Sequence, residues 1–263
     1  MSPKQYDASI KMVPAVQKAF QVLQALTSDN DGWMGISEIC RAIGISKATA
    51  HATLSTLKAL GYVDQNPSSK QYGLGARLLE LSSAYHNRMG SVINIFNSIA
   101  SDLNHQFNET SYMAVLEGTD IIYTAKYDSS RPLRMSSQVG TRLPAHATGL
   151  GKALLTSYTN ETLAQLYNNF TFHPFTPNTI TNLQDLIHCI ETVRVDGVAY
   201  DHCDYWPDVE CVAAPVQDDS GQIVLAISLA QPSSRVTPET LKQEAEAIRK
   251  AAQQFSNVLG FRH

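Results

Sequence analysis

The chain has 263 residues, of which 43% are hydrophobic and 17% charged, a composition typical of a globular protein large enough for two domains. No apolar run approaches the roughly 18 residues of a membrane span, and the first residues lack the apolar core of a signal peptide, so we expect a cytoplasmic protein without membrane contact. The four cysteines are few and unevenly spaced, which favours free thiols over a disulfide framework.

Charge is unevenly distributed, although the whole chain carries only −4. Residues 1–77 contain eight Lys or Arg and five acidic residues, a net of +3, whereas the remainder contains twelve basic and nineteen acidic residues, a net of −7. A basic N-terminal part on an acidic body indicates that the N-terminal part meets phosphate while the body has another task. The excess is modest and favours nucleic-acid binding only together with other signals.

Two helices are expected before residue 45. The first runs from Val13 to Leu26 and ends at the polar stretch 28–32. Helical spacing of its apolar residues predicts one buried face, made of Val16, Ala19, Phe20, Leu23 and Leu26. The second helix is short, with Ser37 as its N-cap, and ends at Gly44.

A third helix and a hairpin follow. Ser46 is expected to cap the helix and Gly61 to close it, with Ala50, Leu54, Leu57 and Leu60 turned to the core. The segments YVDQ and QYGLG, joined by the turn NPSSK, predict a small antiparallel hairpin. A short helix, a glycine turn, a longer helix and a hairpin are typical of a winged helix-turn-helix.

Residues beyond 75 predict a second, mixed domain. An amphipathic helix over 75–90 is expected to link the domains, and a separate helix to follow over 92–107. Strands are predicted over 111–118, 119–128, 132–138, 197–204, 210–218 and 222–231, with turns at EGTD and DDSG. Helices are predicted over 149–158, over 181–197 and from Pro238 to about Val258. Strands flanked by helices indicate an α+β sensor-like sheet.

The third helix has the features that recognition of the DNA major groove requires. Its outer face bears small polar side chains and no carboxylate, so the backbone can approach base edges without repelling phosphate. Lys47 can bind phosphate or guanine, Thr49 can bind phosphate or a thymine methyl, and His51 can donate to a base. The residues expected to bind DNA are Ser46, Lys47, Thr49, His51, Ala52, Ser55, Lys58 and, near the tip of the hairpin, Lys70. An ordinary solvated helix face is the alternative interpretation.

Four segments in order resemble the IclR-type transcriptional regulators. They are GISKATAHATLSTLKALGYV, the hairpin ending in YGLG, LPAHATGLGKALL, and the late block VRVDGVAYDHCD…ECVAAPVQDDSGQIVLAISLAQP. The resemblance implies an α+β protein with a winged helix-turn-helix DNA-binding domain over 1–75, a linker helix over 76–91 and a GAF-like α/β effector-binding domain over 92–263. It also implies a homodimer or homotetramer, no cofactor, and an operator of double-stranded DNA.

The sequence departs from the family pattern at three places. Ala52 stands where an arginine is common in the recognition helix, and Asp208-Val209-Glu210 replaces the usual glycine-apolar pair before Cys211. Ala230 stands where some members have a second serine on the late strand. These departures bear on the operator sequence and on the ligand.

The resemblance also implies where a small organic acid would bind. Met135 and Leu143 would form apolar walls, and Gly149 and Leu150 would begin a helix whose amides suit a carboxylate. Asp201, Cys211 and Ser228 would come from the late strands, with Ser228 as a donor and Asp201 accepting from a hydroxyl. Taken singly, each of these residues is also compatible with a purely structural role.

Two other classes of function stay open from the residues alone. Cys211 with His202, or His146 with Asp201, could serve a hydrolase, although no GxSxG, P-loop or GxGxxG motif occurs. The N-terminal domain could instead bind protein. The pairs His188-Cys189 and His202-Cys203 are of zinc-ligand type, but their spacing matches no zinc clip, and we expect no metal.

Overall fold

A computed structural model describes residues 11–27 and 32–261. The chain divides into two compact units, Tyr6–Gly90 and Ser91–His263. Most of the turn expected at 28–32, and the N-terminal residues 1–10, lie outside the described residues. All four cysteines are free, which confirms the expectation of free thiols.

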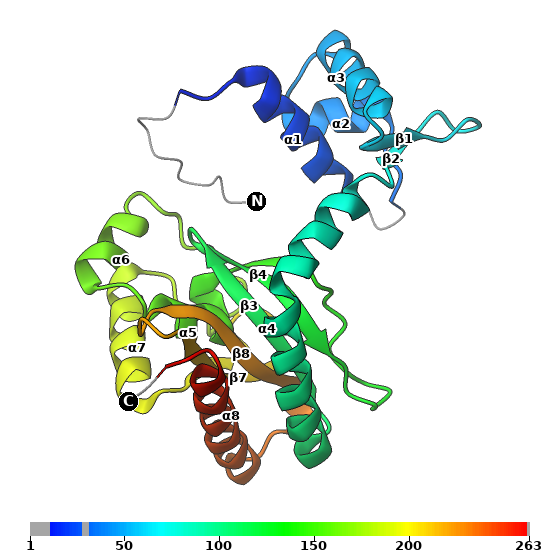
Figure 1. Cartoon of the computed structure of the whole chain (residues 1–263). Helices are drawn as coiled ribbons and strands as arrows, with labels where there is room; N and C mark the ends of the chain where they lie inside the picture. The colour runs from blue at the N-terminus through cyan, green and yellow to red at the C-terminus, as the bar shows by residue number, and fades with distance from the viewer. Residues whose placement is uncertain (1–10, 28–31, 262–263) are drawn as a thin grey trace. The chain divides into compact units, whose positions relative to one another are not determined.

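The N-terminal unit is a winged helix-turn-helix (Figure 1). Its helices are α1 (Pro14–Leu26), α2 (Ile36–Ile43) and α3 (Lys47–Ala59), and its hairpin consists of β1 (Val63–Gln65) and β2 (Tyr72–Leu74). The two strands are antiparallel, with Val63 opposite Leu74. The core of this unit contains Val22, Leu26, Ile39, Leu54, Leu57, Val63 and Tyr72.

Helix α1 buries only part of the predicted face: Leu26 is buried and Ala19 and Leu23 pack against the core, as predicted, but Val16 and Phe20 do not. Val22, Ala25 and Leu26 are buried, whereas Val16 is 53% exposed and Phe20 is 61% exposed. The reason is that the apolar arc of α1 is wider than the arc that α2 and α3 cover, so periodicity alone cannot choose its centre. Val16 and Phe20 therefore form an apolar surface on α1.

The start of α2 is shifted from the expected position. Gly35, not Ser37, is the N-cap, and the Glu38 carboxylate accepts the Gly35 N–H at 2.7 Å. Ser37 lies inside the first turn, so its predicted role as a cap is wrong. The predicted end at Gly44 is confirmed, with φ at 68°, a conformation that glycine adopts without strain.

Helix α3 begins as predicted, because Ser46 Oγ accepts the Thr49 N–H at 3.2 Å. Ala50, Leu54 and Leu57 are buried. Leu60 follows the last helical residue as the C-cap and is 48% exposed, so its predicted place in the core is wrong.

Helix α4 (Leu78–Phe107) replaces the two helices expected over 75–90 and 92–107. Neither Gly90 nor any proline interrupts its hydrogen-bonding pattern, and a single glycine costs a helix only about 1 kcal/mol. The chain therefore passes between its two units within one continuous helix.

The C-terminal unit contains one antiparallel sheet with strand order β5-β4-β3-β8-β7-β6. The strands are β3 (Thr110–Glu117), β4 (Asp120–Tyr127), β5 (Arg142–Pro144), β6 (Ala199–His202), β7 (Val209–Gln217) and β8 (Ile223–Pro232). The expected strand over 132–138 does not form. That segment bears three polar residues and an arginine and crosses the cavity described below, and β5 pairs with β4 instead.

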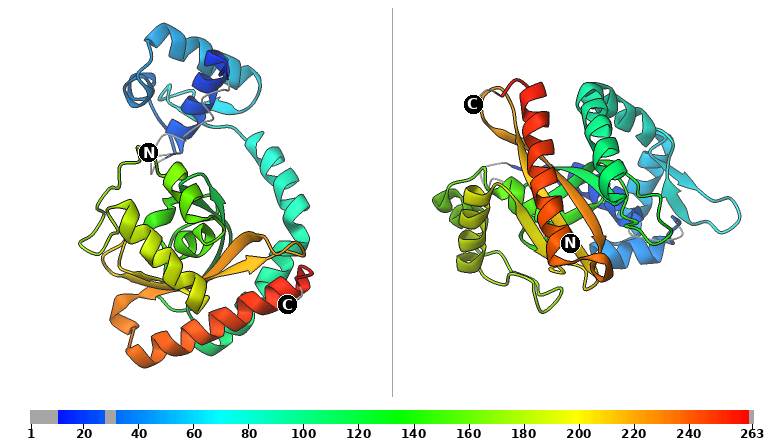
Figure 2. Two further views of the ribbon diagram at one scale, coloured as in Figure 1. Left: turned by 90° about the vertical axis from the view of Figure 1, so that its left-hand side faces the viewer. Right: turned by 90° about the horizontal axis from the view of Figure 1, so that it is seen from below.

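Helices cover both faces of this sheet (Figure 2). The C-terminal half of α4 and α8 (Pro238–Val258) pack on one face, and α5 (Gly149–Leu155), α6 (Asn160–Leu166) and α7 (Leu183–Asp196) on the other. Alternation along β7 explains why both faces are apolar: Cys211 and Ala213 join the α5 side, Val212 and Ala214 the α8 side. Helix α6 and the short 3-10 helices Ala145–Ala147 and Ser233–Arg235 had not been predicted.

Candidate DNA-binding and effector-binding sites

The outer face of α3 presents the residues that were expected to meet DNA. Ser46, Lys47, His51, Ala52, Ser55 and Lys58 are exposed, and Thr49 is half-buried. Thr49 Oγ lies 2.9 Å from Ser46 Oγ, so Thr49 is partly committed to the cap. Ala48 and Thr56 are also exposed on this face and were missed, although a helical projection from the buried Leu54 would have found them.

A chain of side-chain contacts joins α3 to the wing. Lys58 Nζ donates to Gln65 Oε1 at 3.1 Å, and Gln65 Nε2 donates to the Lys70 carbonyl at 3.2 Å. Lys70 is exposed and has a positive φ of 61°, which fixes the turn of the wing. Lys58 therefore positions the wing as well as adding a positive charge to the surface.

The seven residues expected to bind an effector line one cavity in the C-terminal unit. Met135 and Leu143 come from the region after β4, Gly149 and Leu150 from α5, and Asp201, Cys211 and Ser228 from β6, β7 and β8. The space between the lining atoms is about 400 Å³, counting the solvent at its mouth. Ala230, whose departure from the family pattern was expected to bear on the ligand, also lines the cavity, and the lining residues that were not predicted are Tyr112, Tyr123, Ser137, Thr148, Tyr205, Trp206 and Val209.

Two stacked tyrosines form one wall of this cavity. The rings of Tyr112 and Tyr123 lie 4.4 Å apart and are inclined by 20°. Tyr112 donates its hydroxyl hydrogen to the Ser137 carbonyl at 3.2 Å, which holds residues 135–137 against the cavity. Alternation of β3 and β4 could have suggested these tyrosines, since both strands were predicted.

The opposite wall is polar and buried. Asp201 is 6% exposed, and its Oδ1 accepts the Asp204 N–H at 2.7 Å. Burial, and then the charge of Asp204, raise the pKa of the Asp201 carboxyl to about 7. Behind it, buried Lys152 forms an ion pair with Asp204 and donates to the Tyr200 carbonyl at 2.9 Å.

Ser228 and Gly149 define the floor between these walls. Ser228 is 1% exposed, and its hydroxyl lies beside the Cys211 thiol but makes no hydrogen bond of ordinary geometry with a described residue. A methyl group on Gly149 would lie 3.2 Å from Cys211 Sγ and 3.6 Å from Asp201 Cβ. Gly149 and Leu150 occupy the first positions of α5, where backbone N–H groups have no acceptor within the helix.

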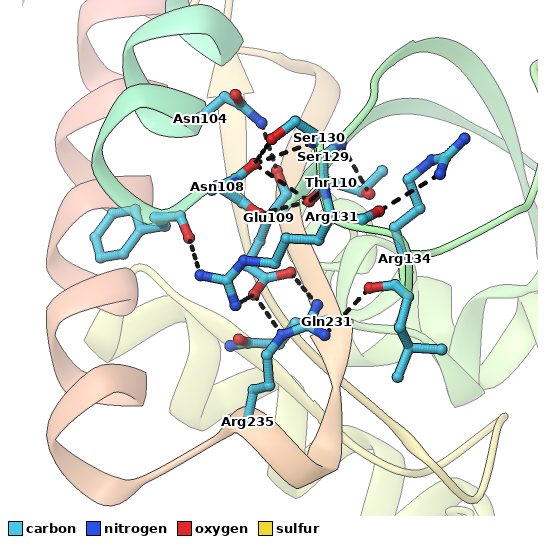
Figure 3. A network of polar contacts seen from close by, with 12 residues as sticks. Asn104, Asn108, Glu109, Thr110, Ser129, Ser130, Arg131, Arg134, Gln231 and Arg235 are labelled. Atoms are coloured by element: carbon cyan, nitrogen blue, oxygen red, sulfur yellow. Dashed lines mark hydrogen bonds and ion pairs between the residues drawn. The ribbon is translucent and has the colours of Figure 1, made fainter.

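A polar network fastens the segment that carries Met135 (Figure 3). The buried Glu109 carboxylate receives two hydrogen bonds from Arg235, at 2.8 and 2.7 Å, and forms an ion pair with Arg131 at 3.1 Å. Arg235 also donates to the Leu133 carbonyl at 3.1 Å. Two residues beyond Leu133, the chain enters the cavity wall.

The geometry does not favour the two hydrolase pairs. Asp201 and Cys211 are opposite each other across β6 and β7, whereas His202 lies opposite Glu210 and is 2.8 Å from its carboxylate. Alternation therefore puts Cys211 and His202 on opposite faces of the sheet, and burial raises the pKa of the Cys211 thiol. His146 is enclosed by the rings of Phe170 and Phe172 and is not part of the cavity. Within residues 11–27 and 32–261, no three His, Cys, Asp or Glu side chains are grouped as a metal site.

Two family models together match most of the chain. The helix-turn-helix domain of IclR matches residues 15–67, and the C-terminal domain of the bacterial transcriptional regulator IclR matches residues 85–257. The chain belongs to the IclR family. It is therefore a transcriptional regulator with an N-terminal DNA-binding domain and a C-terminal ligand-binding domain, not a hydrolase.

Individual IclR-family proteins resemble the chain along its whole length. The regulator XynR of Escherichia coli is 30% identical over 95% of this chain and 98% of its own, and KdgR of the same organism is 30% identical over 99% and 98%. A solved IclR homologue from Microbacterium hydrocarbonoxydans, complexed with 4-hydroxybenzoate, has a TM-score of 0.77 at 20% identity and covers 93% of this chain and 98% of its own. Among the described residues, no helix is both long and apolar enough to cross a membrane.

Proposed function

We propose that this IclR-family regulator binds a rough palindrome of operator DNA as a homodimer, or as a tetramer built from such dimers, in the cytoplasm. Binding of a small organic acid in the cavity of the C-terminal unit controls its affinity for the operator. The observation that carries the effector site is the convergence of residues from five separate segments on one cavity. It includes the buried Ser228 hydroxyl, which makes no hydrogen bond of ordinary geometry with a described residue.

The DNA contacts are proposed for α3 and the wing. The residues are Ser46, Lys47, Thr49, His51, Ala52, Ser55, Lys58 and Lys70. The exposed Lys47 and His51 are supported best, because among the described residues Lys47 has no hydrogen bond or ion pair and His51 has only a 3.5 Å contact with Ser55. Lys47→Ala should weaken binding to any DNA and reduce the salt dependence by about one charge, whereas His51→Ala should relax preference at one base pair. Lys242→Ala, at an exposed lysine of α8, is the matched control. Unchanged DNA affinity in both α3 variants would refute the proposal that this surface binds DNA.

The dimer is supported by apolar surface that the N-terminal unit leaves open. Val16 and Phe20 on α1, Val13 at the N-cap of α1, and Leu79 and Leu81 on α4 are all at least half exposed. A patch of this kind on a soluble protein marks an interface. Phe20→Glu should give monomers by light scattering and weaken operator binding, whereas Val195→Glu, at a more exposed apolar residue on α7, should change neither. A wild-type monomer at micromolar concentration would contradict the dimer.

The effector is proposed to be a small carboxylate. Backbone amides of Gly149 and Leu150 suit the carboxylate, the Ser228 hydroxyl adds a donor, and Met135, Leu143 and the stacked tyrosines suit an apolar or ring-shaped remainder. Cys211 contributes bulk rather than charge, because its thiol stays protonated. The 4-hydroxybenzoate complex of the Microbacterium homologue makes hydroxy aromatic acids a sensible part of any screen.

Calorimetry with glycolate, pyruvate, gluconate, benzoate and 4-hydroxybenzoate tests the effector site. Ser228→Ala should weaken the best ligand by about fivefold to a hundredfold, because a buried hydrogen bond is lost. Ser111→Ala is the matched control, since Ser111 is equally buried and unpaired but lies on the α8 side of the sheet. Equal affinity in wild type and Ser228→Ala would move the site elsewhere.

A further inference from the structure

The side chains that line the effector cavity carry an unusual balance of charge for an anion site. Asp201 is the one acidic residue among them, and none of the described lining residues is Lys, Arg or His. A carboxylate that enters this cavity therefore meets a second carboxyl group and no cationic partner. Two ionised carboxylates in one buried site repel each other strongly.

The nearest cation does not resolve this conflict. Lys152 is 4% exposed, and its ammonium group is already held by the Asp204 carboxylate and the Tyr200 carbonyl. The pair of Lys152 and Asp204 is close to neutral as a unit, so Asp201 remains the unbalanced charge. The Asp204 backbone N–H also donates to Asp201 Oδ1, which fixes the orientation of the Asp201 carboxyl group.

The second oxygen of Asp201 is available to a ligand. Asp201 makes one hydrogen bond within the described residues, at Oδ1, and lines the cavity. Gly149 lies against its Cβ, where a methyl group would be only 3.6 Å away. The absence of a side chain at Gly149 thus leaves the α5 amides and the Asp201 carboxyl facing the same small space.

Among the titratable groups near Asp201, only Lys152 favours its ionisation, and the others disfavour it or are neutral themselves. Across β7, Glu210 adds negative charge and Cys211 is a buried thiol, while from β4 and the loop after β6 the phenols of Tyr123 and Tyr205 keep their protons. Asp204 opposes ionisation of Asp201, and the charge of Lys152 favours it less strongly. Together with burial, these groups raise the pKa of Asp201 to about 7.

We propose that Asp201 binds the effector as a carboxylic acid that donates a hydrogen bond to the effector's carboxylate, so that, at a pH where free Asp201 is ionised, each anion enters the cavity together with one proton. The inference rests on the proposed effector site. The proton comes from solvent, is shared between Asp201 Oδ2 and a carboxylate oxygen of the ligand, and returns to solvent when the ligand leaves. No covalent bond to carbon forms or breaks. Asp201 thereby selects monoanionic acids over uncharged analogues.

The decisive experiment counts protons. Binding of the tightest member of the panel of glycolate, pyruvate, gluconate, benzoate and 4-hydroxybenzoate is measured by calorimetry at pH 6, 7, 8 and 9, in pairs of buffers that differ in ionisation enthalpy. We expect uptake of nearly one proton per ligand at pH 8 and above, and an affinity that falls about tenfold from pH 8 to pH 9. Binding without proton uptake, at an affinity independent of pH, would overturn the proposal and leave the effector site intact.

Asp201→Asn separates this role from the opposite one. The amide is isosteric, keeps an acceptor for the Asp204 N–H and donates to the ligand as a carboxylic acid would. The variant should bind the same acid within about threefold of the wild-type value at pH 6, with no proton uptake and no loss of affinity at pH 9. If Asp201 instead accepted from a ligand hydroxyl as a carboxylate, Asp201→Asn would lose affinity at every pH, which overturns the proposal. No heat from any acid with wild type at any pH would overturn the proposed carboxylate effector as well.

Discussion

His146 illustrates at the scale of one residue how burial ties stability to pH. Its ring is 1% exposed among aromatic rings, and burial lowers its pKa to about 4. Because the folded pKa lies below the value of about 6.5 in the unfolded chain, the stabilisation from neutral His146 is complete above pH 6.5 and is lost as the pH falls toward 4.

Replacing His146 by Phe should remove this acid sensitivity. Between pH 8 and pH 5 the free energy of unfolding of wild type should fall by about 2 kcal/mol more than that of His146→Phe. Urea titrations at both pH values measure the difference. His188→Gln, at an exposed histidine, should behave as wild type. Parallel pH profiles for wild type and His146→Phe would show that His146 is protonated in the folded protein.

Two glycines of α5 should respond differently to the same substitution. A methyl group on Gly151 would lie 2.1 Å from the Ala145 carbonyl oxygen, so Gly151→Ala must displace backbone and should lower stability by roughly 1–3 kcal/mol. Gly149→Ala faces side chains at 3.2 Å or more and should fold, but its methyl group enters the cavity and should weaken acid binding. Thermal unfolding and calorimetry measure the two effects, and a reversed order would contradict the described packing around α5.

At the scale of the element, substitutions at Ser46, the N-cap of α3, can distinguish an effect on stability from an effect on DNA binding. Ser46→Ala removes the acceptor of the Thr49 N–H and should lower the free energy of unfolding by about 1 kcal/mol. Ser46→Asp keeps a capping oxygen and should retain that stability, but its negative charge should repel phosphate and weaken DNA binding about tenfold or more. Operator affinity of Ser46→Asp equal to that of wild type would contradict the placement of DNA at this helix end.

The second feature at this scale is the polar network of Glu109, Arg131 and Arg235. Glu109→Gln leaves Arg131 and Arg235 without their shared carboxylate and should lower the free energy of unfolding by about 2–3 kcal/mol, measured by urea titration. The segment that carries Met135 should loosen, so acid affinity should also fall. Glu246→Gln breaks an exposed pair with Lys250 and should leave the free energy of unfolding nearly unchanged, because solvent screens that pair. Equal losses in the two variants would contradict the importance of burial at Glu109.

Local sequence signals predicted the elements whose ends and turns are determined by residues within the element itself. Ser46 and Gly44 specify the ends of their helices through a side-chain cap and a positive φ, and the hairpin of β7 and β8 follows from alternating apolar residues around DDSG. The errors occurred where distant packing decides. The buried face of α1 depends on α2 and α3, and the irregular path of 132–138 depends on Tyr112 and Arg235, more than twenty residues away.

The effector cavity could be predicted in part for the same reason. Glycine, aspartate and serine in recognisable motifs pointed to Gly149, Asp201 and Ser228. Alternation along β3 and β4 marks Tyr112 and Tyr123 as neighbours of one face, but their place in the cavity wall follows from the strand order β4-β3-β8-β7-β6, and Trp206, in the connection between β6 and β7, has no local signature. The charge balance around Asp201 likewise required the position of Lys152, which pairs with Asp204 fifty-two residues away.

In the whole molecule, control of transcription by an effector requires that acid binding and DNA binding are coupled. Coupling between two sites is reciprocal in free energy, and a value of about 1 kcal/mol already changes affinity about fivefold. Helix α4 belongs to both units, so the same helix begins beside the wing and ends in the core of the sheet domain.

The most direct test is the affinity of the full chain for DNA upstream of its own gene, measured by fluorescence anisotropy at fixed moderate salt, with and without the acid that binds most tightly in calorimetry. The account predicts that the acid changes the Kd of wild type by at least about fivefold and leaves that of Ser228→Ala nearly unchanged at the same acid concentration. The Ser111→Ala control should respond as wild type does. An identical Kd with and without a bound acid would contradict the central claim that the cavity controls DNA binding.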